Sequence, residues 1–160
     1  EHDEGFQTIR IDDYCQQQRA QLGIIMLDIE GAEFKALQGA ENTLNQDQPT
    51  VVFEVHRDYV DWSNGLANTP ICKLLSQKGY EIFGLRDFNT NQEMGNLPIE
   101  LVPVDTVYLE GPPHGFNMVA APPGANWLKS PLVKMVPNVS PKLLRHRAPA
   151  LHHPTDGLPD

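Results

Sequence analysis

Residues 24–33 read IIMLDIEGAE, and this stretch decides the predicted fold. Its first four residues, Ile24–Leu27, form a short continuous apolar run, which is typical of a strand covered on both faces. From residue 32 to about residue 45, hydrophobic residues recur at helical spacing, which predicts a helix with one apolar stripe. A second apolar run follows at Thr50–Val55. The pattern predicts a strand–helix–strand unit, and the crossover through a helix makes the two strands parallel.

The same alternation continues on both sides of this unit. Upstream, Phe6–Ile11 has the composition of a strand, and Asp12-Asp13 begins a helix that ends at Gly23. Downstream, Thr69-Pro70 begins a helix that ends at Gly79. Two more strands are predicted at Tyr80–Leu85 and Val104–Leu109. The fold class is therefore α/β, with a mostly parallel sheet, helices on both faces, and a last strand that is free to run antiparallel at an edge.

Composition changes abruptly near residue 111. Ten of the 14 prolines lie in residues 111–160, which hold five Lys/Arg against two acids, whereas residues 1–110 hold seven Lys/Arg against 19 acids. Proline removes a backbone donor and restrains the residue before it. We therefore expect a partial α/β domain over 1–110 and an extended or disordered tail over 111–160, where the one regular element that the sequence allows is a short helical piece near residues 140–147.

Charge and cysteine content restrict the partners. The chain of 160 residues carries a formal charge of −9, which disfavours nucleic acid or an anionic membrane as the main partner. No apolar run approaches the length that spans a bilayer. Cys15 and Cys72 are far apart and lack metal-ligand spacing, so no cysteine-type metal site is predicted. These features favour a reducing, cytoplasmic location and a small-molecule partner.

Acidic side chains follow three predicted strands, at the edge where open α/β sheets bind ligands. The candidates are Asp12 and Asp13 after the first strand, Asp28, Glu30 and Glu33 after the second, and Glu54 with His56 at the third. Clustered carboxylates repel one another unless a cation, a metal ion or a hydroxyl donor meets them. A structural alternative stands beside this hypothesis: an acid can cap a helix, and Glu30-Gly31 can be only a turn.

The run from "IRIDD" through "LDIEGAEFKALQGAENTL" to "QPTVVFEVH" is more specific than this general pattern. It resembles the FkbM-type methyltransferases, which use S-adenosylmethionine, over about residues 6–86. Asp28–Glu33 matches their "DVEGAE" segment almost letter for letter, although Met26 stands where the family usually has lysine. The resemblance implies a class I methyltransferase (Rossmann-like) fold, whose strand order is 3-2-1-4-5-7-6. The strands here would be the third to seventh, and the glycine-rich cofactor loop would lie upstream of Glu1.

The resemblance also implies roles for the acidic residues. Asp28 would lie beside the methionine end of the cofactor, and Glu30 would bind or deprotonate the acceptor hydroxyl of a sugar, glycan or other small metabolite. Glu54 and His56 would line the acceptor side, and Asp12 or Asp13 would accept a hydrogen bond from the adenine amino group. No metal site is required by any spacing in the chain.

Two readings without methyl transfer remain open. A strand ending in Asp28 after an earlier acidic pair is reminiscent of a phosphorylated receiver module, but only 15 residues separate Asp13 from Asp28. That is too few for the helix–strand–helix that a receiver places there. The chain can also be an inactive fragment of a methyltransferase that survives as a binding module.

Overall fold

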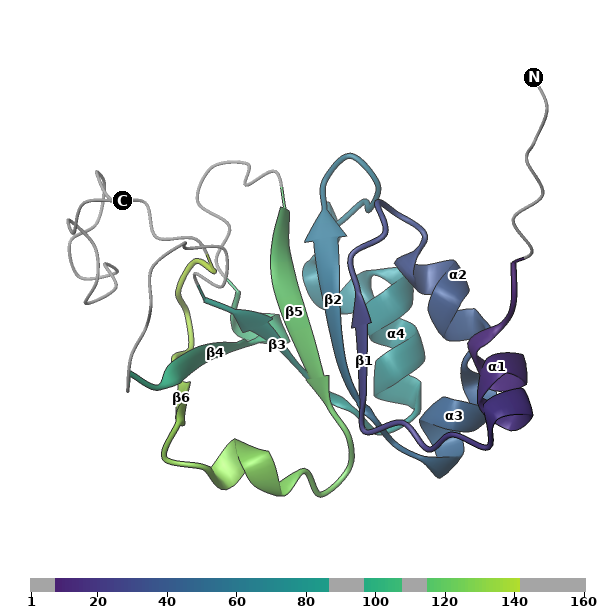
Figure 1. The fold of residues 1–160 in the computed structure, drawn as a ribbon. Coiled ribbons are helices and arrows are strands. Elements are labelled where there is room, and N and C mark those ends of the chain that lie inside the picture. Colours follow the sequence, from purple (N-terminus) through teal and green to yellow (C-terminus); the bar gives the residue numbers. More distant parts are fainter. Residues whose placement is uncertain (1–7, 87–96, 108–114, 142–160) are drawn as a thin grey trace, which may run out of the picture.

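The computed structural model describes residues 8–86, 97–107 and 115–141. They form an α/β fold in which four α-helices pack on a six-stranded mixed sheet (Figure 1). The helices are α1 (Ile11–Gln18), α2 (Glu33–Gln38), α3 (Glu41–Gln46) and α4 (Pro70–Gln77), with short 3-10 turns η1 (Leu66–Asn68), η2 (Val104–Thr106) and η3 (Asn126–Lys129). The strands are β1 (Ile24–Leu27), β2 (Thr50–His56), β3 (Glu81–Leu85), β4 (Ile99–Pro103), β5 (Gly115–Ala121) and β6 (Val133–Met135).

The strands pair in the order β1-β2-β5-β3-β4-β6. β1 and β2 are parallel, as predicted, and β4 and β6 are also parallel. The other three pairings are antiparallel, so the expectation of a mostly parallel sheet is wrong. Because β5 is antiparallel to both β2 and β3, the strands β1, β2 and β3 still run in one direction and end at the same edge of the sheet.

Strand β5 lies in the part of the chain that was predicted to be a tail. Residues 111–160 were expected to lack regular elements other than a short helical piece, yet Gly115–Ala121 is a strand between β2 and β3, and all seven of its residues are buried. All of the expected helical piece beyond Pro141 lies outside the described residues. The physical reason is that the proline pairs 112–113 and 122–123 flank this apolar run instead of interrupting it. Proline is tolerated beside a strand, where no ladder hydrogen bond is lost.

Three further predictions are corrected. The part of Phe6–Ile11 that the structure describes is not a strand, since Ile11 already begins α1. Val104–Thr106 forms η2 instead of the strand predicted at Val104–Leu109, and the strand is β4, directly before it. The helix expected from residue 32 to 45 is divided into α2 and α3 at Gly39-Ala40. The predicted strands at Ile24–Leu27, Thr50–Val55 and Tyr80–Leu85 and the helix after Thr69 are confirmed within two residues of their bounds.

Two hydrophobic cores lie on the two faces of the sheet. On one face, alternate residues of β1, β2 and β5 pack against α2, α3 and α4, with Phe53, Phe116 and Leu37 almost fully buried. The other face is covered by η3, beside Val133 of the edge strand β6, and not by an α-helix, so the prediction of helices on both faces is wrong for the part of the chain described here. Trp127 of η3 fixes this cover by donating a hydrogen bond to Thr50 Oγ1 at 3.1 Å.

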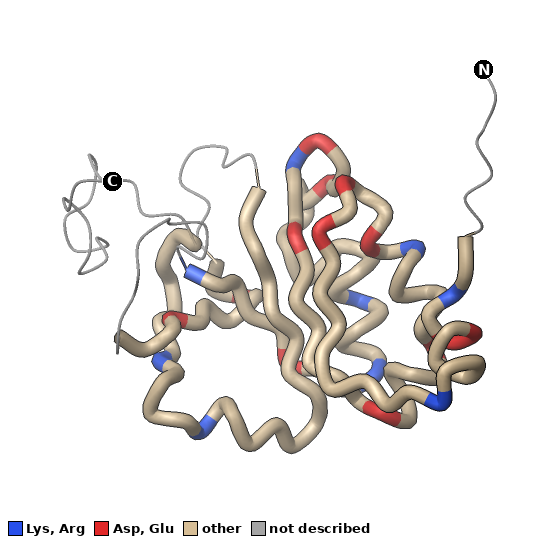
Figure 2. Tube along the Cα trace, viewed as in Figure 1, with Lys and Arg blue, Asp and Glu red and all other residues tan. Residues whose placement is uncertain are grey.

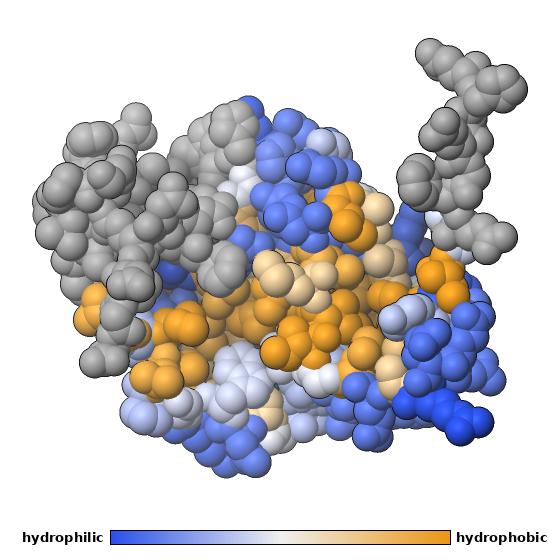
Figure 3. Space-filling view, viewed as in Figure 1, coloured by the Kyte–Doolittle hydropathy of each residue, from blue (hydrophilic) through white to orange (hydrophobic). Residues whose placement is uncertain are grey.

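This cover does not extend over β1, the strand at one side of the sheet. Ile24 and Met26 of β1 are 67% and 62% exposed, and Figure 3 shows hydrophobic surface gathered over β1, β2 and β5. Within the described ranges, no helix is long and apolar enough to cross a membrane.

We expect Leu37→Ala to lower the free energy of unfolding by about 2–5 kcal/mol, because it removes a fully buried side chain that holds α2 on the sheet. The neighbouring Gln38→Ala, at an exposed position of the same helix, should change it by less than about 0.5 kcal/mol. Urea unfolding of both variants measures the difference, and equal effects would contradict this description of the core.

Candidate functional site

The parallel register of β1 and β2 brings acidic side chains together at the carboxyl ends of the two strands. Leu27 pairs with Phe53, so Asp28 and Glu54, the next residues, lie beside each other. Figure 2 shows acidic residues gathered where these two strands end. The strand-end cluster predicted from the sequence is therefore present for Asp28, Glu30, Glu54 and His56.

The charges of the other members of this cluster shift the pKa of Glu54. Burial raises the pKa of Glu54, and the negative charge of Asp28 raises it further. Glu30 and Glu33 act in the same direction, whereas His56 lowers the pKa. Asp28 is exposed and Glu54 is half-buried, and neither accepts a hydrogen bond from the residues that the structure describes. This end of the sheet therefore presents uncompensated negative charge, which suits a cationic ligand or a hydroxyl donor.

The turn after β1 holds Glu30 in an unusual conformation. Glu30 has φ +55° and Gly31 has φ +94°, both in the left-handed region. The ring of Tyr59 packs on Gly31 so closely that a Cβ there would lie 2.8 Å from Tyr59 Cβ. The pKa of the Tyr59 hydroxyl is raised, first by its hydrogen bond with Glu30 and then by the Glu30 charge. Tyr59 and Glu30 are therefore close neighbours at this end of β1.

Glu33 has a structural role within this turn. It is 5% exposed, and its Oε1 accepts a hydrogen bond from the backbone N–H of Ile29 at 2.9 Å. This bond closes the turn from β1 into α2. Glu33 therefore differs from Asp28, whose carboxylate is exposed and accepts no hydrogen bond from any residue in the described ranges.

His56, the last residue of β2, is held by its neighbours. Its Nδ1 accepts a hydrogen bond from the backbone N–H of Asp58 at 3.2 Å, and its ring lies 5.3 Å from that of Tyr59, centroid to centroid. Gly115 of β5 pairs with His56 in the antiparallel register. A Cβ at residue 115 would lie 2.6 Å from Glu54 Oε1 and 2.8 Å from His56 Cδ2. A side chain at 115 would therefore displace Glu54 and His56, a packing constraint that no local sequence signal indicated.

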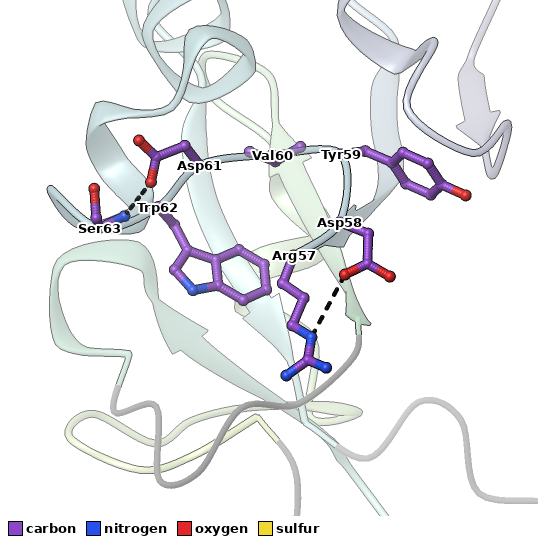
Figure 4. A pocket seen from close by; sticks show the side chains of 7 residues that line it. All are labelled: Arg57, Asp58, Tyr59, Val60, Asp61, Trp62 and Ser63. Atoms are coloured by element: carbon purple, nitrogen blue, oxygen red, sulfur yellow. Dashed lines mark hydrogen bonds and ion pairs between the residues drawn. The ribbon is translucent and has the colours of Figure 1, made fainter.

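Two cavities adjoin the cluster. One of about 280 Å³ is lined by Gly31, Glu33, Phe34, Lys35, Glu54, Tyr59, Val60, Asp61, Pro70 and Ile71. The other, of about 440 Å³, is lined by residues 57–63 of the loop after β2 (Figure 4). Figure 4 shows Tyr59 and Trp62 leaving this loop in different directions, and Trp62 packs against Phe116 at 5.8 Å between ring centroids. The loop can therefore contact a ligand that sits at the ends of β1 and β2.

Asp12 and Asp13 lie apart from this cluster, on α1 against α3. The Asp12 carboxylate accepts hydrogen bonds from the backbone N–H groups of Asn42 and Thr43 and from Thr43 Oγ1. These bonds outweigh the effect of burial and lower the pKa of Asp12. Asp12 therefore caps α3, which explains why the predicted helix divides at Gly39-Ala40. Both aspartates line a separate depression of about 410 Å³ between α1 and α3.

Within the described ranges, no group of three or more His, Cys, Asp or Glu side chains is arranged to hold a metal ion.

Comparison with known proteins identifies the class of the domain. Residues 2–82 match the family model of the methyltransferase FkbM domain, a segment that contains β1, β2 and the whole acidic cluster. The match spans half of the 160 residues, and the chain belongs to the FkbM methyltransferase family. A methyltransferase domain indicates an enzyme. Neither a curated protein nor a solved structure matches the chain.

Gly115→Ala tests how β5 shapes the site. The added methyl group should displace the Glu54 carboxylate and the His56 ring, because it would stand within 2.8 Å of both. The imidazole resonances of His56 in NMR spectra should move. Gly23→Ala is the matched control, since a Cβ there meets nothing within 4 Å. Unchanged His56 resonances in Gly115→Ala would rule out this packing.

Glu54→Gln should stabilise the protein at neutral pH. The pKa of Glu54 in the folded state lies above its ordinary value of 4.5, so the folded protein binds this proton more tightly than the unfolded chain does. The favourable contribution is present below pH 4.5 and is lost as the pH rises through the folded-state pKa. We expect Glu54→Gln to raise Tm at pH 7 and not at pH 4. Glu81→Gln, at the exposed start of β3, should raise it at neither pH.

Proposed function

We propose that this chain acts as an S-adenosylmethionine-dependent methyltransferase that transfers a methyl group to a hydroxyl of a sugar, a glycan or another small metabolite. One observation carries the proposal: Asp28, Glu30 and Glu54 gather at the carboxyl ends of two parallel strands inside the segment that matches the methyltransferase family. Ligands of open α/β sheets bind at this edge.

The order of the strands supports the class I assignment. In the class I order 3-2-1-4-5-7-6, the seventh strand lies between the fifth and the sixth. The four strands β1, β2, β5 and β3 agree with the part 4-5-7-6, because β5 comes after β3 in the chain and yet lies between β2 and β3. β5 also runs antiparallel to both neighbours.

The carboxylates of the site fit the cationic groups of S-adenosylmethionine. Glu54 lies in a field of like charges and has no hydrogen-bond donor among the residues described, so a sulfonium or an ammonium group would offset the repulsion. Asp28, exposed directly after β1, is the residue that would hold such a group. When bound, the cofactor supplies the methyl group. The chain itself supplies charge and position, which account for much of the rate of a transfer reaction.

The acceptor side is formed by Glu30, Glu54 and His56. Glu30 is exposed beside the Tyr59 hydroxyl, so its carboxylate is accessible to the proton of an acceptor hydroxyl. Glu54 lines the cavity of about 280 Å³ beside it. Its raised pKa makes it a stronger base than an ordinary carboxylate. His56 borders the same end of β2. Asp12 is a weaker candidate for an adenine contact because its oxygens already cap α3.

Two substitutions separate cofactor binding from proton transfer. In the full-length protein, Asp28→Asn should weaken binding of S-adenosylmethionine at least about tenfold, because it removes negative charge beside the cationic groups. Glu30→Gln should leave that affinity nearly unchanged and lower turnover by about 10²–10⁴-fold. Isothermal titration measures the affinity, and release of S-adenosylhomocysteine with a panel of hydroxylated acceptors measures turnover.

Glu81→Gln serves as the control for both measurements, since Glu81 begins β3 and therefore lies at the opposite edge of the sheet. It should behave as the wild type does. The proposal is wrong if the wild-type protein binds no S-adenosylmethionine, or if Asp28→Asn binds it as tightly as the wild type.

A further inference from the structure

A buried ion cluster joins β3, β4 and β6. Arg86, directly after β3, has a side chain that is only 6% exposed, and its Nη1 donates to Glu100 Oε2 at 2.6 Å. The other oxygen of Glu100 accepts a hydrogen bond from Lys134 Nζ at 2.8 Å. Burial raises the pKa of Glu100, but the hydrogen bonds from Lys134 and Arg86 outweigh it and lower the pKa. Glu100 is therefore an ionised carboxylate with both oxygens engaged.

Arg86 is engaged on one side only. Its Nε and Nη2 are buried and have no hydrogen-bond partner, and no other buried side-chain nitrogen or oxygen in the described ranges is in this state. Burying a polar N–H without a partner is unfavourable, and more so when the group is charged. Native proteins seldom leave such groups unpaired unless a water, an ion or a ligand meets them.

The geometry of the two unpaired nitrogens indicates which chemical group would bind them. Nε and Nη2 form one edge of the planar guanidinium, and their N–H bonds point the same way. That edge matches the two oxygens of a carboxylate or a phosphate, which arginine binds in a bidentate manner. Water offers a single oxygen and no charge, and so complements this edge less well.

The charge of the cluster agrees with an anionic ligand. Arg86 and Lys134 carry two positive charges against the one negative charge of Glu100, in a chain whose formal charge is −9. One further negative charge would balance the cluster. Lys134 is 57% exposed, so the cluster reaches solvent on its side.

We propose that Arg86 is a binding site for an oxyanion, a carboxylate or a phosphate group, which accepts hydrogen bonds from Nε and Nη2. Glu100 holds the guanidinium in place through Nη1, and Lys134 adds positive charge. β3 ends at the same edge of the sheet as β1 and β2, so the anion lies at the edge that carries Asp28 and Glu54. A ligand that reaches both places has a cationic or hydroxyl part and an anionic part; this last step alone rests on the proposed function.

Titration of the full-length protein tests the site. Protein labelled with ¹⁵N at arginine Nε is titrated with inorganic phosphate or with acetate, and sodium chloride keeps the ionic strength constant. The Arg86 Nε–H resonance should move and saturate with phosphate, with acetate or with both, and the effective anion tells a phosphate from a carboxylate ligand. No saturable shift with either anion up to about 100 mM, weaker than any useful affinity, would overturn the proposal.

Variants distinguish bidentate binding by the guanidinium edge of Arg86 from attraction by its positive charge alone. Arg86→Lys keeps the charge and loses the bidentate edge, so the dissociation constant should rise at least about tenfold. Arg57→Lys, at an exposed arginine that pairs with Asp58 at 3.6 Å, is the matched control and should bind as the wild type does. Equal affinity of Arg86→Lys and the wild type would contradict the site.

If Arg86→Lys does not fold, Lys134→Gln takes its place, because Lys134 is largely exposed and its loss removes one positive charge from the cluster. Weaker anion binding by this variant supports the proposal, and unchanged binding refutes it. None of these readouts depends on methyl transfer. A protein that binds S-adenosylmethionine and neither anion would refute only the oxyanion site.

Discussion

The insertion of β5 between β2 and β3 is the constraint on which the rest of the structure depends. Phe116, Met118 and Ala120 enter the core beneath the α-helices, whereas Val119 and Ala121 enter the core beneath η3 and β6. One strand thus joins the two cores. It also fixes the direction of β3 relative to β2, and so brings the ends of β1, β2 and β3 to one edge. At that edge, the absence of a side chain at Gly115 leaves room for Glu54 and His56.

The features that the sequence predicted well are those encoded within a few neighbouring residues. The apolar runs Ile24–Leu27 and Thr50–Val55 and the Thr69-Pro70 start of α4 each contain their own signal, and each element formed. The neighbourhood of Asp28 and Glu54 was also predictable, because a helical crossover makes two strands parallel and parallel strands end together. The pairing of Leu27 with Phe53 confirms it.

The features that the sequence did not predict depend on contacts between distant residues. The proline pairs that flank β5 look locally like a disordered tail, and only the partner strands β2 and β3 make the run between them a central strand. The division between α2 and α3 depends on Asp12, which caps α3 from a position 31 residues before Thr43. An aspartate at a helix start gives the same local pattern whether it caps its own helix or a neighbouring one.

Hydrogen bonding separates the charges that hold the fold from those that are left without a donor more clearly than sequence position does. Asp12 and Glu33 accept backbone N–H groups, so their negative charge is already used to hold the fold. Asp28 and Glu54 have no such donor in the part of the chain that the structure describes, and burial together with like charges raises the pKa of Glu54. Such an arrangement lowers stability and persists where a ligand offsets it. Arg86 is the positively charged counterpart, because two of its buried N–H groups have no hydrogen-bond acceptor. An anion would supply one. The sheet edge therefore carries unpaired charges of both signs, negative at the ends of β1 and β2 and positive after β3. This arrangement suits a ligand that has separate positive and negative groups.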